Sequence, residues 1–164
     1  ALLGISPQGW LRRWDTDGYI KPRLWPNASL PPNSLVVVSK DDLPGEILPL
    51  SWASGQTHVV NTYGSLGAYI RYRDHEWHVP PFPAKVTDTT GAGDIFTTAY
   101  LVRYSETMDI NSAGIFASSA ASLSIEKSGI DSAPNRAVIK KRIAAHCNLK
   151  VHRHFKFGNY KPIS

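Results

Sequence analysis

One polar loop carries most of the residues whose types and spacing could do chemistry. It runs from Asp88 through Gly91 and Gly93 to Asp94, where an apolar pattern of helical spacing begins. Backbone N–H groups at the start of a helix favour negative charge, and glycines let a ligand approach the backbone closely. Phosphate is the natural occupant of such a loop. The sequence therefore predicts an anion hole made by the N–H groups of Gly91, Ala92 and Gly93.

Asp94 is unexpected at this position, because a carboxylate beside a phosphate site repels the ligand. Its presence is explained if it accepts the proton of a hydroxyl group that attacks the phosphate. A structural interpretation stays open, because an Asp in the first turn stabilises the helix dipole and loops rich in Thr and Gly often only connect elements. On spacing alone this structural interpretation is slightly favoured.

The run Asp88-Thr-Thr-Gly-Ala-Gly-Asp94, followed by Phe96, resembles the C-terminal signature of the ribokinase-like (PfkB) family of carbohydrate kinases. The resemblance implies an α/β fold, namely the C-terminal portion of a three-layer ribokinase-like sandwich with a central, mostly parallel sheet, a β-hairpin and flanking helices. It also implies ATP-dependent phosphoryl transfer to a hydroxyl of a sugar or sugar-like acceptor. Asp94 is then the catalytic base, and Mg²⁺ bridges the phosphates of ATP.

Four further residues are connected with the nucleotide by this resemblance. Thr62, Gly64 and Gly67 form the pattern Thr-x-Gly-x-x-Gly, which lies beside the nucleotide phosphates in the family. Glycines around any hairpin would give the same pattern. Ser118 occupies the position at which relatives place a polar residue against the nucleobase, and a solvent-facing helical serine is an equal alternative.

Two acidic residues are connected with cations in the same way. Ser39-x-x-Asp42 keeps the spacing of the family's Asn-x-x-Glu but neither residue type, so Asp42 is expected to hold Mg²⁺ through bound water. Asp88 and the loop at 129–132 correspond to residues that help to hold a monovalent cation, which makes K⁺ a candidate.

Hydrophobic patterns predict the elements that position these residues. Strands are expected at 2–5, 35–38, 57–62, 68–72 and 76–79, and helices after Asp94, from about 109–111 and over 134–145. The segment 10–32 is expected to be irregular or weakly paired. Along the first helix Ile95, Ala99 and Val102 repeat at helical spacing, with Phe96 and Tyr100 on an adjoining stripe. In the last helix Val138 and Ile139 are expected to face inward.

Composition describes an ordinary soluble globular protein, with 42% hydrophobic and 19% charged residues among 164. No apolar run approaches the roughly 20 residues of a membrane helix. The single cysteine, Cys147, excludes an internal disulfide and fits the cytoplasm. The net charge of +5 permits binding to polyanions, but a solvated basic face is favoured over nucleic acid. Residues 150–164 are expected to be a loosely attached basic tail beyond a catalytic portion at 1–149.

The resemblance spans 35–145 and corresponds to the C-terminal half of a family member. The expected partners are therefore ATP, a small polyhydroxy acceptor and the N-terminal half of the same protein, without which the isolated fragment is expected to turn over poorly. Two alternatives stay open. One is a non-catalytic nucleotide-binding or interaction module of the same fold, and the other is a kinase acting on nucleosides or inositols.

Overall fold

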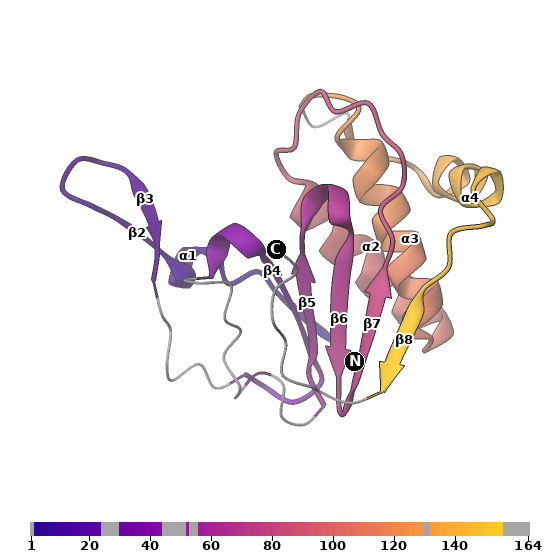
Figure 1. Cartoon of the computed structure of the whole chain (residues 1–164), viewed down its shortest axis with the longest axis horizontal. Helices are drawn as coiled ribbons and strands as arrows, with labels where there is room; N and C mark the ends of the chain where they lie inside the picture. The colour runs from indigo at the N-terminus through magenta and orange to yellow at the C-terminus, as the bar shows by residue number, and fades with distance from the viewer. Residues whose placement is uncertain (1, 24–29, 44–51, 53–55, 130–131, 156–164) are drawn as a thin grey trace.

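The strands form one six-stranded sheet and a separate two-stranded hairpin (Figure 1). The computed structural model describes residues 2–23, 30–43, 52, 56–129 and 132–155. The sheet order is β1-β4-β5-β6-β7-β8. Its strands are β1 (Leu3–Ile5), β4 (Ser34–Ser39), β5 (His58–Thr62), β6 (Ala68–Tyr72), β7 (His75–Val79) and β8 (His152–Phe155). The first three are parallel and the rest pair antiparallel, so the sheet is mixed where a mostly parallel one was expected.

The parallel half of the sheet is covered on both faces. Along β4, Leu35 and Val37 join the core beneath the long helices, whereas Val36 and Val38 join a second core cluster on the opposite face. Continuous β-branched strands are typical of this arrangement, because both of their faces are buried. The predicted strand at 2–5 is present, but it lies at the edge of the described sheet and Leu3 is 54% exposed.

Two long helices, α2 (Ala92–Thr107) and α3 (Ile110–Ser124), lie side by side on one face of the sheet (Figure 1). Asp109 caps α3 by accepting the N–H groups of Asn111 and Ser112, close to the predicted start. A side chain at Gly114 would lie 2.8 Å from a methyl group of Val79, so this glycine lets α3 approach β7 closely. The close approach fixes the position of the helix that borders the site.

The buried stripe of α2 differs from the helical repeat read in the sequence. Phe96, Ala99 and Tyr100 are buried, whereas Val102 is 41% exposed. Because Phe96 and Tyr100 are part of the core, the face of α2 that carries them lies against the sheet. Val102 consequently faces solvent. In α4 (Arg136–Ala145), Ile139 is buried as expected but Val138 is 42% exposed, so the inward assignment of Val138 was wrong.

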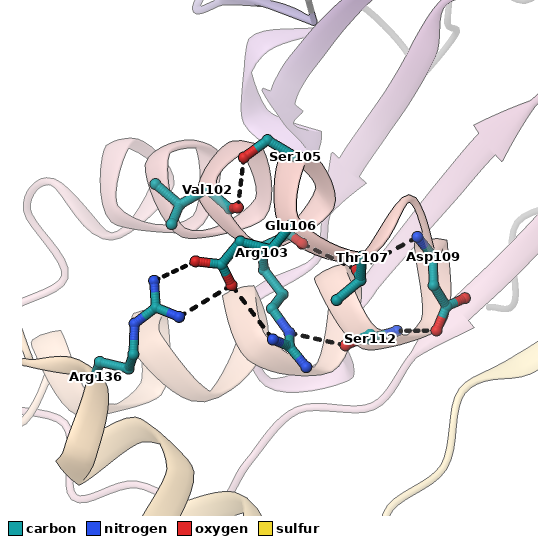
Figure 2. Close-up of polar contacts among 8 residues, drawn as sticks. All are labelled: Val102, Arg103, Ser105, Glu106, Thr107, Asp109, Ser112 and Arg136. Carbon is teal, nitrogen blue, oxygen red and sulfur yellow. Dashed lines mark hydrogen bonds and ion pairs between the residues drawn. The ribbon is translucent and has the colours of Figure 1, made fainter.

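Polar contacts join the end of α2 to α3 and α4 (Figure 2). The guanidinium of Arg136 forms a two-pronged ion pair with Glu106, and Arg103 donates to Ser112 of α3 and to Glu106. The hydrogen bond from Arg136 lowers the pKa of Glu106 to about 2. Glu106 therefore stays ionised and connects the three helices over the ordinary pH range.

The N-terminal segment combines a short helix with a two-stranded pair. The helix α1 (Gln8–Leu11) was not expected, whereas the antiparallel pair of β2 (Arg12–Trp14) and β3 (Ile20–Pro22) agrees with the expectation of irregular or weakly paired structure at 10–32. The pair projects away from the long helices (Figure 1). Trp14 is 72% exposed, which explains why the hydrophobic pattern of this stretch did not predict a strand.

The basic tail is partly built into the sheet. β8 pairs antiparallel with β7, and the guanidinium of Arg153 lies 5.4 Å from the centre of the Trp77 ring. The expectation of a loosely attached terminus was wrong for these residues, and the rest of the tail, 156–164, lies outside the described residues. No helix in the described part of the chain has both the length and the apolar character to cross a bilayer.

Candidate active site

Two cavities meet at the carboxyl ends of the parallel strands, where open α/β sheets bind ligands. The first, of about 500 Å³, has mainly apolar walls from the segment after β7 and from α3. The second, of about 610 Å³, is more polar and is bordered by the ends of β1, β4 and β5. Five of the described residues line both: Thr62, Gly64, Thr89, Ala92 and Gly93. The loop from Asp88 to Asp94, which the sequence predicts to bind phosphate (the phosphate loop), therefore forms part of the boundary between the two cavities.

The loop presents two of the three predicted amide groups. The N–H of Ala92 donates to the carbonyl oxygen of Thr89 at 3.2 Å, so it is already used within the turn. The N–H groups of Gly91 and Gly93 have no acceptor among the described residues. Of the three N–H groups predicted to form an anion hole, those of Gly91 and Gly93 are therefore available and that of Ala92 is not.

The physical reason for glycine differs between positions 91 and 93. Gly91 precedes α2 with φ of +75°, a left-handed conformation that favours glycine. Gly93 has no positive φ, and a side chain added there would meet no atom within 4 Å. Neither backbone strain nor packing within the described chain therefore requires glycine at 93. Close approach of a ligand to the backbone would explain it, so this role stays a prediction.

Asp94 lies in the first turn of α2, is exposed, and lines the more polar cavity. No side-chain cap bond is present at this helix start. Among the described residues, none donates a hydrogen bond to its carboxylate. The side chain is therefore free to accept a proton from a hydroxyl in that cavity, and it does not point into packed interior.

Asp42 lines the same cavity but is 1% exposed and fully engaged. Its Oδ1 accepts from Nε of Arg12 at 2.7 Å and pairs with Nη2 at 2.5 Å. Its Oδ2 accepts the N–H of Ser39 at 2.9 Å, closing a capping box around the short turn 40–42. Holding Mg²⁺ through bound water would require Asp42 to share these oxygens, and that role stays a prediction.

The pattern at 62–67 borders the cavities as expected. Gly64 and Gly67 have φ of +56° and +90°, and Thr62 donates its hydroxyl to the carbonyl of Val38 at 3.3 Å. A side chain at Gly67 would collide with the carbonyl oxygen of Val79, so the hairpin itself requires this glycine. At Gly64 a side chain would meet nothing within 4 Å, and it is the left-handed backbone conformation that favours glycine there.

Ser118 is buried rather than solvent-facing, and it lines the apolar cavity. Its hydroxyl donates to the carbonyl of Pro80 at 2.8 Å. The donor is therefore used, and the oxygen remains able to accept a hydrogen bond. A nucleobase would have to present an amino or N–H group to contact this serine.

Asp88 borders the phosphate loop without lining either cavity. Its carboxylate accepts the N–H of Thr90 at 2.9 Å, and this bond lowers its pKa. Its own N–H and that of Thr87 donate to the carbonyl of Ile125 at the end of α3. The expected partner loop at 129–132 includes residues 130–131, which lie outside the described residues, so the cation site stays a prediction.

The segment from the end of β1 to the start of β2 also lines the polar cavity, and no feature of the sequence predicted a function for it. Its lining residues are Ser6, Gln8 and Arg12, and Lys40 after β4 lines the same cavity. A general rule could have identified them, because Ser6 directly follows a predicted parallel strand and the carboxyl ends of such strands meet at one edge. The separation of Arg12 from Asp42 along the chain conceals their ion pair in the sequence.

Known proteins match both the sequence and the fold of this chain. The profile of the family described as "pfkB family carbohydrate kinase" matches residues 46–136, which is more than half of this chain. The chain belongs to the pfkB family. The resemblance carried by Asp88–Asp94 is thereby confirmed.

Individual pfkB relatives extend this finding. Ribokinase of Bacillus subtilis is 44% identical over 64 residues, which cover 39% of this chain and 22% of the relative. The structure of Arabidopsis thaliana ribokinase with ribose and ATP matches with a TM-score of 0.58 at 28% identity, covering 66% of this chain and 40% of that one. For Burkholderia thailandensis nucleoside kinase with inosine the TM-score is 0.59 at 29% identity, covering 71% and 41%. The chain spans less than half the length of each of these relatives.

Proposed function

We propose that this chain carries the phosphoryl-transfer half of an ATP-dependent kinase that phosphorylates a hydroxyl group of a sugar or sugar-like acceptor. The observation that carries the proposal is the exposed Asp94 beside the unengaged amides of Gly91 and Gly93, at the junction of two cavities. The family and the ribokinase relatives support the same reaction class. Nucleosides and inositols are the alternative acceptors.

Asp94 acts as the general base in this proposal. Its carboxylate accepts the proton of the acceptor hydroxyl while the oxygen attacks the γ-phosphorus and the bond to ADP breaks. An ordinary carboxylate is a weak base, so its contribution comes from its placement and from proton transfer late in the step. The N–H groups of Gly91 and Gly93 stabilise the charge on the transferred phosphoryl oxygens.

The apolar cavity is proposed to receive the nucleobase. Pro81, Phe82 and Val86 offer apolar surface, and Val86 is 62% exposed in the absence of a ligand. Thr62, Gly64 and Gly67 then lie toward the phosphates, and the Ser118 oxygen accepts from the base. Each of these contacts remains a proposal.

Magnesium fits the site only partly. In the part of the chain that is described, no group of three or more His, Cys, Asp or Glu side chains could hold a metal ion. Mg²⁺ commonly binds through substrate phosphates, water and one or two carboxylates, so the nucleotide itself would supply most ligands. Its chemistry would be to neutralise phosphate charge, with Asp42 as the proposed holder of bound water and Asp88 as a proposed ligand of K⁺.

A phosphorylation screen tests the proposal. The protein is incubated with ATP and a panel of sugars, inositols and nucleosides, beside the variant Asp94→Asn. We expect one acceptor class to be phosphorylated, and we expect the variant to lose about 10²–10⁴-fold in turnover, the usual range for loss of a general base. Equal turnover by Asp94→Asn would refute the assignment of the base.

A non-catalytic nucleotide-binding module is the second candidate. The engagement of both Asp42 oxygens favours it, because the carboxylate expected to face magnesium is already paired. ATP binding without turnover of any acceptor would support the module over the kinase.

Two wider features belong to the same proposal. Because the match covers less than half of each relative, we propose that a further segment of the kinase completes the acceptor site and excludes water from it. We also propose a cytoplasmic location, which suits the exposed free thiol of Cys147.

A further inference from the structure

Two cations without an assigned role line the polar cavity, Arg12 and Lys40, and Arg12 is the one held by a buried carboxylate. It opens β2, directly after α1, and lines the same cavity as Gly91, Gly93 and Asp94. Its side chain is 33% exposed, so it is accessible from that cavity. The cavity thus joins a guanidinium, two free amides and the proposed base.

Asp42 engages only one edge of the Arg12 guanidinium group. Nε and Nη2 are both directed at Oδ1 of Asp42, at 2.7 and 2.5 Å. Nη1 has no acceptor among the described residues. Because the guanidinium group is planar and rigid, fixing one edge also fixes the direction of the remaining N–H groups. Asp42 in turn is fixed by the N–H of Ser39 at 2.9 Å, so the pair is anchored to the end of β4.

If the ion pair between Arg12 and Asp42 served stability alone, Arg12 would not need to line the polar cavity. A buried carboxylate requires a partner, and Arg12 satisfies that requirement with one edge alone. The neighbouring Arg13 shows the contrast, because it is exposed on the same strand and lines neither cavity. The remaining donors of Arg12 therefore have no acceptor among the described residues, and Arg12 lines the cavity proposed for phosphoryl transfer.

We propose that Arg12 binds an anionic oxygen in front of Asp94, and that Asp42 is its positioning residue. The shared chemistry is a phosphate or carboxylate oxygen accepting from the guanidinium. Two sources could provide it: the terminal phosphate of the nucleotide, or an acidic group on the acceptor. The inference rests on the proposed phosphoryl transfer and adds a specificity-determining residue to it.

Binding titrations on the chain itself separate the two sources. One arm measures the affinities for ATP, ADP and AMP by calorimetry, and the other compares D-gluconate with D-sorbitol in the presence of ADP. Arg12→Lys keeps a positive charge for Asp42 but lacks the second edge of the fork, so it tests the contact without stranding the buried carboxylate. Arg13→Lys is the matched control on the same strand.

A contact with the terminal phosphate predicts that Arg12→Lys weakens ATP binding about 10-fold or more, with AMP binding unchanged. A contact with the acceptor predicts the same loss for gluconate only, with all three nucleotides unchanged. The double variant Arg12→Leu with Asp42→Asn, which removes the charge of both partners together, should reproduce whichever loss is seen. A thermal melt of each variant confirms folding.

The inference is overturned if both Arg12 variants match Arg13→Lys in both arms. If nucleotide binding by the unaltered chain is present and responds to Gly93→Ala, that result leaves the proposed function standing and removes only the role of Arg12. If the unaltered chain binds no nucleotide, the proposed function and the inference fail together.

Discussion

Two turns supply an aspartate to the same cavity, and they hold it in opposite ways. The turn after β4 buries Asp42 and engages both of its oxygens with Arg12 and Ser39. The loop before α2 leaves Asp94 exposed without a donor among the described residues. Both residues are short acids at the edge of a parallel sheet. Their surroundings alone make one a structural anchor and the other a candidate base.

A buried histidine outside both turns, His58, makes the stability of the protein depend on pH. His58 is 2% exposed, its Nδ1 lies 2.9 Å from the hydroxyl of Tyr100, and its ring stacks on Tyr72. Burial lowers the pKa of His58 from its ordinary value of 6.5 to about 4. The unfolded chain therefore binds more protons between these values, and stability rises with pH there.

The loss of stability at low pH caused by protonation of His58 is the largest effect we expect. Lowering the pH from 6.5 to 4 should reduce the free energy of unfolding by on the order of 3 kcal/mol. Urea titrations across this range measure it, and His58→Phe should flatten the dependence while keeping the stacking. An equal slope in that variant would place the acid sensitivity at a group other than His58.

At neutral pH the two aspartates should differ in stability. We expect Asp42→Ala to lower the free energy of unfolding by about 2–3 kcal/mol, because it strands part of Arg12 and removes the capping box. Asp94→Asn should change it by about 0.5 kcal/mol or less, as exposed substitutions usually do. Urea unfolding of both variants is the measurement. Similar losses from both substitutions would break the contrast between anchor and base.

Within the exposed loop, Gly91 should resist substitution more than its neighbour. Gly91→Ala forces a side chain into φ of +75° and should cost about 1–2 kcal/mol of stability. Thermal melts of this variant beside Gly93→Ala provide the test. If Gly91→Ala were neutral, the loop would have to adopt another conformation in solution.

Gly93→Ala is expected to give the smallest change in stability and the clearest sign of function. No steric obstacle exists at this site, and alanine favours a helix, so stability should rise by up to about 0.5 kcal/mol. Nucleotide affinity should nevertheless fall about 10-fold if the amide binds phosphate closely. Unchanged affinity in an equilibrium titration would mean that no ligand approaches this backbone.

The sequence predicted the frame of the site well, because local signals determine it. Continuous apolar runs predicted β4 and β5, alternation predicted the β6–β7 hairpin, and Asp109 marked the start of α3. The placement of Asp94 at the start of a helix followed from the same pattern. What these elements have in common is that neighbours in the chain decide their conformation.

Other features depend on partners that are distant in sequence. The ion pair between Arg12 and Asp42 forms only when the ends of β1 and β4 lie side by side. β8 forms because the edge of β7 is available for antiparallel pairing. This pairing makes part of the basic stretch a strand, where a loose tail was expected. The engagement of Ala92 is a detail of the turn, decided by the carbonyl of Thr89, that residue types do not encode.

Under the proposed function, the limited overlap of the two cavities would separate acceptor choice from nucleobase binding. Ser6, Gln8 and Arg12 border only the polar cavity, and Ser118 borders only the apolar one. Exchanging the segment 6–12 would then alter the polar cavity while the walls proposed for the nucleobase stay intact. In evolutionary terms, such an arrangement would let substrate range diversify by changes in one short stretch, without rebuilding the apolar cavity.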